Sequence, residues 1–429
     1  MKHVIIIGGG ILGLSCAYYL QRSGQAQVTV LEAGEFAAGA TSQAAALLTR
    51  ARADLNARHF VAETHDIIKR FERERNESLM QRSGCWHLVD DGCATDTLNR
   101  YQEIALSQGV TAGFHNDESI QTQFPWLNLK ANATALEYRD DGFIDPYLLA
   151  VVYMQQAKNS GARLLANTRV TALQAENGTI CAVRSNDETF KCDDVILAAG
   201  PWGKSFARQY GISLPLATVR SHYWITNPQD QITRDMPMLI DQANGFYFRS
   251  ENGALLFGVR DSLGCYTNAE QLPDDIHALG FPEDPQGWAA LEENWQALIE
   301  RCPLLEQAQL SHYIAGVSSY TPDGKPLLGK PQGWQNLNVV AGCSGAGIAW
   351  SGGIGKAMAA SILDDTSTER LDIAPYGLDS FGQGAAAPDV FSDEFQQQCA
   401  LHVARKKQVK CLKGKMLCIR KFNQKFITG

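Results

Sequence analysis

The sequence predicts an α/β fold in which a parallel sheet is built from separate stretches of the chain and a second, mainly antiparallel sheet forms between them. Three observations lead to this prediction. A buried-type strand, a glycine-rich turn and an apolar helix open the chain, hairpin signals fill its middle, and further strands ending in glycines follow near residues 200 and 345. At 429 residues the chain is long enough for two domains.

The first element is a strand followed by a GxGxxG turn. Residues 4–7 form an unbroken apolar run, and Gly8, Gly10 and Gly13 permit a tight turn, a close backbone approach to a pyrophosphate and close helix packing. Glu32 ends a second strand, where its carboxylate can bind a ribose 2′-hydroxyl and repel a 2′-phosphate. This spacing is typical of a Rossmann-like dinucleotide-binding start that disfavours NADP. A glycine-rich helix start made only for packing is the alternative.

The composition is that of an ordinary globular protein. Hydrophobic residues make up 45% of the chain and charged residues 20%. The eleven cysteines form no CxxC pair, so we expect no disulfide framework, no metal site and a cytoplasmic protein with reduced thiols. We expect no targeting segment, because glycines interrupt the apolar stretch 4–20, which leads into the second strand.

The charge is distributed unevenly along the chain. Residues 400–429 hold nine Lys or Arg and no acid, which leaves 29 basic and 46 acidic residues elsewhere. The acidic body argues against a nucleic-acid partner. The basic tail suits peripheral contact with an anionic membrane, but a solvated tail is favoured because its apolar residues form no helical stripe. We expect residues after Pro388 to be dispensable for cofactor binding.

The next elements are a loop of small residues and a helix. Tiny side chains at residues 37–46 let backbone amides approach a ligand, and Thr41 and Ser42 add hydroxyl groups. A helix over residues 55–76 has one apolar face and is expected to pack on the surface of the domain.

The middle of the chain leaves the first sheet and then returns to it. We expect a strand at residues 85–89, polar helices and turns over 90–140, and a helix from Asp145-Pro146 to about residue 160. A hairpin turns at Asn177-Gly178. The buried strand beginning at Asp194 then ends in a glycine turn before Trp202, which brings the chain back to the first sheet.

The second half of the chain contains the antiparallel sheet and then returns to the first sheet for the last time. Strands are expected at residues 219–226, 245–249 and 254–260, followed by an apolar-faced helix around residues 288–298. A further strand from residue 337 ends in a second glycine-rich helix start. Two such helix N-termini in one sheet suit a long dinucleotide such as FAD, whose adenosine end would lie at Glu32.

These elements define the expected domains and the expected FAD contacts. The FAD-binding domain would comprise residues 1–84, 141–213 and 314–375, the substrate domain 85–140 and 214–313, and a C-terminal extension 376–429. The residues expected to contact FAD are Gly8, Gly10, Ile11, Leu12, Gly13, Glu32, Ala33, Ala40, Thr41, Ser42, Ala45, Ala46, Leu47, Val170, Gly200, Trp202, Gly345, Ala346, Gly347 and Ile348.

Taken together, the motifs resemble the D-amino-acid oxidase and sarcosine oxidase family over about residues 1–375. The matches are the N-terminal GxGxxG with its acid, the Gly39-Ala-Thr-Ser loop, Gly142-Phe-Ile-Asp-Pro, Leu197-Ala-Ala-Gly-Pro-Trp, Tyr247-Phe-Arg, Thr321-Pro-Asp-Gly-Lys-Pro and Gly342-Cys-Ser-Gly-Ala-Gly. The resemblance implies oxidation of a C–N bond by hydride transfer to flavin N5, which gives an imine that water hydrolyses. The electron acceptor would be oxygen, a quinone or another carrier.

This chain also departs from that family. The cations that bind a substrate carboxylate in its branches are replaced by Ser318 and Ala349, and the positions of covalent flavin attachment by Gln43 and Gly316. We therefore expect non-covalent FAD.

Another arginine must then pair with any substrate carboxylate. Arg50, Arg52 and Arg260 are candidates, with solvated surface arginines as the alternative. Tyr247 and His222 are candidates to line the substrate site; an ordinary core aromatic is an equal alternative for Tyr247, and a structural histidine is the favoured interpretation of His222. No catalytic acid or base stands out.

Two other functions remain open. The same fold can oxidise a 2-hydroxy acid by taking hydride from a C–OH carbon, which a base near the flavin would favour. A flavin-binding assembly factor with little turnover is also compatible with the missing carboxylate cations.

Overall fold

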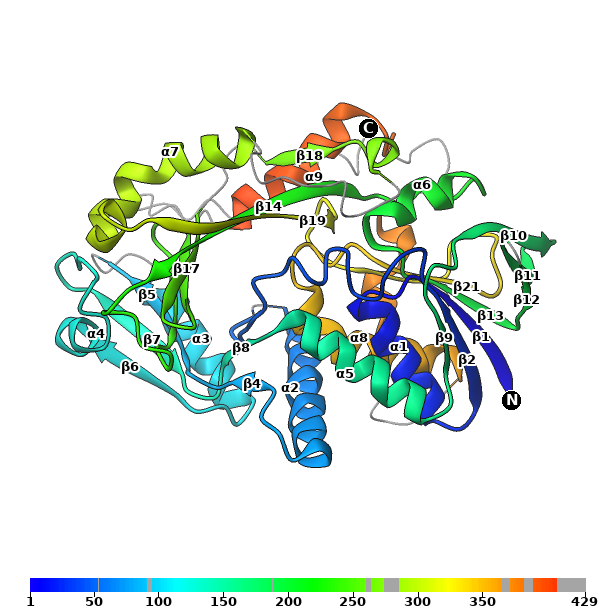
Figure 1. Ribbon diagram of the computed structural model, residues 1–429, viewed down its shortest axis with the longest axis horizontal. Coiled ribbons are helices and arrows are strands. Elements are labelled where there is room, and N and C mark those ends of the chain that lie inside the picture. Colours follow the sequence, from blue (N-terminus) through cyan, green and yellow to red (C-terminus); the bar gives the residue numbers. More distant parts are fainter. Residues whose placement is uncertain are drawn as a thin grey trace.

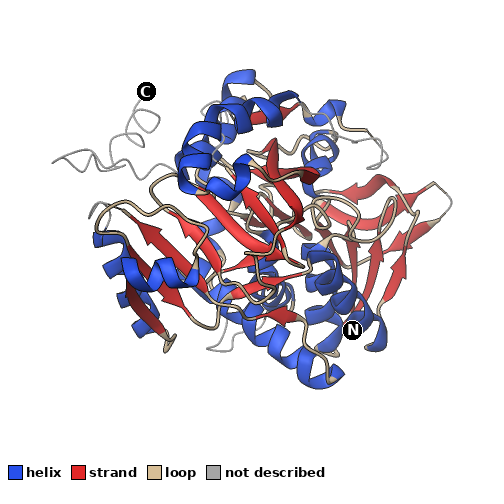
Figure 2. Cartoon of the chain, turned by 60° about the vertical axis from the view of Figure 1, so that its left-hand side comes forward, coloured by secondary structure: helices blue, strands red, loops and turns tan. Residues whose placement is uncertain are grey.

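The computed structural model describes residues 1–52, 54–90, 95–186, 188–259, 264–273, 285–364, 371–381 and 389–406. It confirms the predicted α/β fold, with a mostly parallel sheet and a mixed, mainly antiparallel sheet. The two groups of strands face each other across the small-residue loop (Figure 1), and Figure 2 shows them from another side.

The first sheet gathers strands from three separate parts of the chain. Its six strands lie in the order β20-β21-β13-β1-β2-β9, and every neighbouring pair is parallel except β20 with β21. The return segments near residues 200 and 345 therefore reach the sheet as predicted. Their bounds are β1 Lys2–Ile7, β2 Ala26–Leu31, β9 Arg163–Leu165, β13 Asp194–Leu197, β20 Leu327–Gly329 and β21 Leu337–Ala341.

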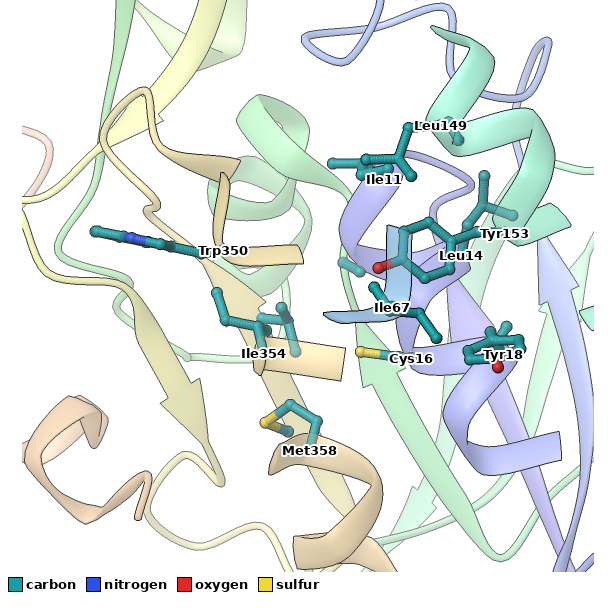
Figure 3. Close-up of a cluster of buried hydrophobic side chains, with 14 of the residues drawn as sticks. Ile11, Leu14, Cys16, Tyr18, Ile67, Leu149, Tyr153, Trp350, Ile354 and Met358 are labelled. Carbon is teal, nitrogen blue, oxygen red and sulfur yellow. The ribbon is translucent and has the colours of Figure 1, made fainter. Parts of the chain in front are cut away.

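Four helices form one packed layer against this sheet. They are α1 Ile11–Arg22, α2 Leu55–Arg75, α5 Pro146–Asn159 and α8 Gly347–Ile362. Figure 3 shows side chains of all four meeting in one buried cluster, which includes Ile11, Tyr18, Ile67, Tyr153 and Ile354. The Asp145 side chain accepts hydrogen bonds from the first two amides after Pro146, which confirms the predicted start of α5.

Glycines in α8 let the layer pack closely. A Cβ at Gly355 would lie 2.1 Å from Ser15 Oγ of α1, and a Cβ at Gly353 would lie 2.2 Å from Phe60 Cα of α2. The Ser15 hydroxyl donates to Ser351 O at 2.7 Å across the same contact. This packing fixes the N-terminus of α8 beside that of α1.

The second sheet has nine strands and runs through the other half of the molecule. Its order is β18-β14-β17-β16-β15-β5-β7-β6, with β19 paired to β14. Its only parallel pair within the described residues is β5 with β15. The bounds are β5 Cys85–Val89, β6 Ala112–Asn116, β7 Thr134–Tyr138, β14 Ala217–Pro228, β15 Met238–Asp241, β16 Phe246–Glu251, β17 Ala254–Gly258, β18 Cys265–Thr267 and β19 Leu310–Tyr320.

The prediction for residues 90–140 was wrong in part. Helices α3 Thr95–Ser107 and α4 Asp117–Gln123 are present, but β6 and β7 lie in the same stretch. These strands escaped the prediction because β6 is short and polar, and tertiary pairing with β7 stabilises it more than its own sequence does.

Smaller elements complete the fold. One small sheet joins β10 Val170–Glu176, β11 Thr179–Ser185 and β12 Thr189–Lys191, with the predicted Asn177-Gly178 turn, and another joins β3 Leu47–Leu48, β8 Gly142–Ile144 and β4 Met80–Gln81. The remaining helices are α6 Gly203–Arg208, α7 Pro285–Arg301 and α9 Asp393–Lys406, with 3₁₀ turns η1 Gly200–Trp202, η2 Ala269–Gln271, η4 Pro303–Glu306, η5 Ala374–Tyr376 and η6 Leu378–Phe381. Within the described part of the chain, no helix is both long and apolar enough to span a membrane.

The C-terminal segment before the basic tail is part of the packed body. Helix α9 (orange in Figure 1) lies along β14, and its buried Phe395 and Cys399 share a cluster with Val219. The buried ammonium of Lys204 donates to Leu216 O at 2.6 Å and to Val390 O. This packing indicates that residues 389–406 contribute to stability, while their dispensability for cofactor binding stays a prediction. Residues 407–429, which carry most of the basic tail, lie outside the described residues.

A truncation after Pro388 is expected to destabilise the protein. It removes α9, exposes the apolar surface beneath it and takes away one carbonyl partner of Lys204. We expect the free energy of unfolding to fall by at least about 3 kcal/mol, the usual cost of losing one large core side chain. Urea denaturation measures this loss, and a truncation after Lys406, which keeps every described residue, is the control. Equal stability of all three proteins would show that α9 is dispensable.

Candidate functional site

A cavity of about 1330 Å³ lies between the two sheets. It is larger than the pockets that hold most drug-sized ligands, which measure about 300–1,000 Å³. One end is lined by Glu32 and the turn after β1, the middle by the small-residue loop and the start of α8, and the far end by residues of the second sheet such as Tyr247. The cavity is therefore long and spans both halves of the molecule.

Nearly all the residues expected to contact FAD line this cavity; Gly13 and Ser42 do not. A Cβ at Gly13 would lie 2.1 Å from Gly8 O, so this glycine serves helix–strand packing. The Ser42 hydroxyl donates to Ala38 O at 2.9 Å and to Gly39 O at 3.1 Å, so it braces the loop from within.

The first end of the cavity has the features of a nucleotide cradle. Both oxygens of the Glu32 carboxylate accept backbone hydrogen bonds, one from Gly9 N at 2.7 Å and the other from Gly34 N at 2.9 Å. These bonds fix the carboxylate at the cavity wall, and each oxygen keeps a further lone pair for a ribose hydroxyl. Gly8 has a φ of 108°, and a Cβ there would lie 2.5 Å from Ala198 O, so only glycine fits this turn.

The start of α1 fits a pyrophosphate. Gly10 lines the cavity, and a Cβ built on it would meet only one atom within 4 Å, Thr41 Oγ1 at 3.3 Å. The same Thr41 oxygen accepts the amide hydrogen of Ile11 at 3.0 Å. The space beside Gly10 is thus open to a ligand at a helix N-terminus, where backbone amides and the helix dipole favour an anion.

The second glycine-rich helix start, at α8, also lines the cavity. Ser344 and Gly345 precede α8 with φ angles of 49° and 80°, which turns the chain back toward the cavity. A Cβ at Gly345 would lie 2.7 Å from Tyr320 Oη. The Ser344 hydroxyl holds the bend, because it accepts Thr321 N at 3.2 Å and donates to Gly342 O at 3.2 Å.

The two positions without an attachment residue lie against each other. The Gln43 side-chain oxygen accepts the amide of Val317 at 3.0 Å, and a Cβ at Gly316 would lie 3.0 Å from Gln43 O. Both residues line the cavity, as does the buried Cys343. Because glycine at position 316 has no side chain, the small-residue loop and β19 can pack closely against each other.

Aromatic and polar side chains of the second sheet form the far wall. Tyr247 lies over Gly258 on the neighbouring strand, where a Cβ would come within 2.2 Å of its ring, and burial raises the pKa of its phenol. The buried His222 shares a hydrogen bond of 2.8 Å between its Nδ1 and Tyr313 Oη, and the two rings stack. Tyr247 and His222 both line the cavity, and their contact with a substrate stays a prediction.

The three arginine candidates differ in their position relative to the cavity. Arg50 does not line the cavity, because its Nε pairs with Asp141 Oδ1 at 2.8 Å, so the interpretation of Arg50 as a substrate anchor was wrong. Arg52 does line it, and its buried Nε has no hydrogen-bond partner among the residues that the structure describes. Desolvation lowers the pKa of the Arg52 guanidinium, while Tyr101 and Asp141 oppose that shift. Arg260 lies outside the described residues.

A polar group near Arg52 escaped the sequence analysis. Gln242 and Thr49 line the cavity, and His87 lies behind them: its Nδ1 is 3.0 Å from Gln242 Nε2 and its Nε2 is 3.4 Å from Thr49 Oγ1. Burial, with a smaller effect of Arg52, lowers the pKa of His87 to about 3, so the ring is neutral. The only signal in the sequence was a histidine inside an otherwise apolar strand.

The pKa of His87 predicts acid sensitivity. The folded protein keeps the ring neutral down to about pH 3, whereas the unfolded chain takes up a proton below its usual pKa of 6.5. Stability is therefore fully present above pH 6.5 and falls as the pH drops toward 3, by about 1.4 kcal/mol per pH unit for this group. In urea denaturation between pH 7 and pH 4.5, His87→Gln should show a shallower dependence on pH than the wild type. His59→Gln, at an exposed position of α2, is the control and should retain the wild-type slope. A wild-type slope in His87→Gln would contradict the assignment.

Among the described residues, no three His, Cys, Asp or Glu side chains are grouped in a way that could hold a metal ion. The site therefore consists of a nucleotide cradle, two helix N-termini, and a wall carrying Tyr247, His222 and Arg52.

Comparisons with known proteins agree with this geometry. The family model described as FAD dependent oxidoreductase matches residues 3–361. Human mitochondrial dimethylglycine dehydrogenase is 29% identical over 84% of this chain and 42% of its own length, and the 4-methylaminobutanoate oxidase (formaldehyde-forming) of Paenarthrobacter nicotinovorans is 27% identical over 84% and 44%. This chain thus spans less than half of those relatives. The L-proline dehydrogenase structure from P. horikoshii shares the fold, with a TM-score of 0.76 at 23% identity over 88% of this chain and 96% of that one. Because the family model covers most of the chain, this protein belongs to the FAD-dependent oxidoreductase family.

Proposed function

We propose that this chain oxidises the C–N bond of a small amino acid or secondary amine, using non-covalently bound FAD as the hydride acceptor. The observation that carries the proposal is the cavity lined both by Glu32 and by Arg52, whose buried Nε has no hydrogen-bond partner among the residues that the structure describes. Three of the relatives, dimethylglycine dehydrogenase, 4-methylaminobutanoate oxidase and sarcosine dehydrogenase, have names that denote oxidation of small N-substituted amino acids. The electron acceptor would be oxygen or a quinone or other carrier.

The residues of this chain have a limited set of tasks in that reaction. Bound FAD supplies the hydride-accepting centre. Glu32 and the turn at Gly10 hold its nucleotide half, and the start of α8 holds the other half. Arg52 pairs with the substrate carboxylate, and Tyr247 and His222 shape the wall against which the amine lies. The apolar lining excludes water from the amine, which favours its neutral, oxidisable form.

Anaerobic mixing of the holoprotein with a substrate panel tests this function. The panel contains sarcosine, N,N-dimethylglycine, 4-methylaminobutanoate, L-proline, glycine, a D-amino acid and L-lactate. We expect flavin absorbance to bleach with at least one carboxylated amine and to persist with lactate. Bleaching by lactate alone would support a hydroxy-acid dehydrogenase, and no bleaching by any compound would support a flavin-binding assembly factor. Readmitting oxygen, or adding a quinone, identifies the acceptor that restores the colour.

FAD is expected to leave the protein on acid denaturation. Neither Gln43 nor Gly316 offers a nucleophile to the flavin ring, and these residues occupy the positions at which the resembling family attaches it. After acid precipitation, the yellow colour should stay in the supernatant with the absorbance of free FAD. A yellow pellet would contradict non-covalent binding, and Cys343, which also lines the cavity, would be the first residue to examine by peptide mapping.

A further inference from the structure

Two cysteines lie directly opposite each other on neighbouring strands, away from the cavity. Strands β11 and β12 are antiparallel, with Ala182 facing Lys191. One step along this register, Cys181 faces Cys192, and the Cys192 amide donates to Cys181 O at 3.1 Å. The two residues therefore form a hydrogen-bonded cross-strand pair.

This register places the two thiols within bonding reach. Opposed residues of such a pair project to the same face of a sheet, and their Cα atoms are about 5.5 Å apart. A disulfide needs Cα atoms about 4.4–6.8 Å apart. Cys181 is exposed, Cys192 is half-buried, and neither is in a disulfide. The Cα separation typical of such a pair thus falls within the range that a disulfide requires.

The other cysteines that the structure describes are placed differently. Cys16, Cys85, Cys302, Cys343 and Cys399 are all buried and belong to apolar packing or to the cavity wall. Among cysteines of described burial, only Cys181 is exposed to solvent. Among these seven cysteines, Cys181 is therefore the one that an oxidant arriving from solvent meets first, with Cys192 beside it.

We propose that Cys181 and Cys192 form a redox-sensitive dithiol that peroxide converts into a cross-strand disulfide. The Cys181 thiolate attacks hydrogen peroxide, the O–O bond breaks, hydroxide leaves and the sulfur becomes a sulfenic acid. The Cys192 sulfur then attacks that of Cys181, the S–S bond forms, the S–O bond breaks, and the departing hydroxide takes the Cys192 proton as water. In total, two thiols and one peroxide give one disulfide and two waters.

The environment assigns the two roles. Cys181 is the attacking residue because it is accessible, and its Sγ makes a weak contact of 3.3 Å with Gln174 O. Cys192 is the resolving residue because it is partly covered, and burial together with Cys181, Asp193 and Asp194 raises the pKa of its thiol to about 12. Because Cys181 is exposed, reductants can reach the disulfide through that sulfur and the change is reversible.

The sequence around the pair allows a direct test on the intact holoprotein. Trypsin cleaves after Arg169, Arg184, Lys191 and Lys204, so Cys181 and Cys192 fall on separate peptides, 170–184 and 192–204, each with one cysteine. After treatment with hydrogen peroxide and blocking with N-ethylmaleimide, mass spectrometry without reductant should find these two peptides joined. Dithiothreitol added before blocking should abolish the joined species.

Two variants separate the roles of the thiols. Cys192→Ser should stop at the sulfenic acid on Cys181, which dimedone traps, and Cys181→Ser should leave Cys192 unmodified at the same peroxide concentration. Cys181 is exposed, Cys192 is only half-buried at the edge of a core cluster, and serine is close to cysteine in size, so the variants should fold like the wild type. The proposal fails if peroxide leaves both wild-type thiols reduced, drives Cys181 to a sulfinic acid, or links Cys181 between two molecules. It does not depend on the substrate or on turnover.

Discussion

A Gly10→Val variant is expected to fold but to bind no FAD. Gly10 lines the cavity at the N-terminus of α1, and its missing side chain leaves open the space that the pyrophosphate requires. The first carbon of a side chain would meet only Thr41 Oγ1 at 3.3 Å, which the protein can tolerate with a small shift. The branched methyl groups of valine would then project into the cradle and exclude the phosphates. The flavin-to-protein ratio of the purified variant measures the effect and should fall close to zero.

Gly113→Val is the matched control for this substitution. Gly113 lies on β6 of the second sheet, has no atom within 4 Å of a built Cβ and does not line the cavity. This control should carry the wild-type amount of flavin. If soluble Gly10→Val also retains wild-type flavin, the pyrophosphate does not lie at the start of α1 and the proposed placement of FAD is wrong.

An Arg52→Ala variant is expected to lose most of its affinity for carboxylated substrates. Its guanidinium reaches the cavity, and its Nε has no hydrogen-bond partner among the described residues, so a substrate carboxylate would complete its bonding. Removing one partner of a buried charge pair costs about 2 to 5 kcal/mol. This corresponds to an increase in the dissociation constant of about 30-fold to about 5,000-fold. Titration of the flavin absorbance with the best substrate of the panel, or with a carboxylate inhibitor, measures it.

Two control variants show whether a loss of carboxylate affinity in Arg52→Ala is specific to this guanidinium. Arg52→Lys keeps the charge but not the planar fork, so it should recover only part of the affinity. Arg73→Ala removes an exposed arginine of α2 and should leave binding unchanged. If Arg52→Ala binds carboxylates as tightly as the wild type, Arg260 becomes the remaining sequence candidate, and an uncharged amine becomes the better substrate class.

The parts of the fold that sequence predicted are those with local signatures. The run before Gly8, the Asp145-Pro146 helix start and the Asn177-Gly178 turn each depend on residues within a few positions, and each appears where expected. The return segments were also recognisable, because a buried parallel strand ending in glycines is distinctive in composition.

The parts that sequence missed depend on distant partners. Strand β6 is stabilised by its pairing with β7, and its short sequence alone gives no clear sign of a strand. Arg50 and Arg52 are two positions apart and chemically identical, so only the location of Asp141 decides which one is neutralised. The role of His87 likewise depends on Gln242, which is far away in the chain. Sequence therefore located the cofactor cradle better than the substrate wall.

The scattered origin of the first sheet has a consequence for how the protein is made. Strand β1 pairs with β2 at once, but its other neighbour, β13, begins at residue 194, and β13 in turn pairs with β21, which ends at residue 341. Helix α8, which covers α1 and α2, follows only after that. During synthesis from the N-terminus, the second edge of β1 stays exposed until β13 has left the ribosome, and the far edge of β13 stays exposed until β21 has followed, a state prone to aggregation. Chaperone protection and FAD insertion thus belong to the end of translation, and no contiguous N-terminal fragment shorter than the α8 region contains the complete cradle.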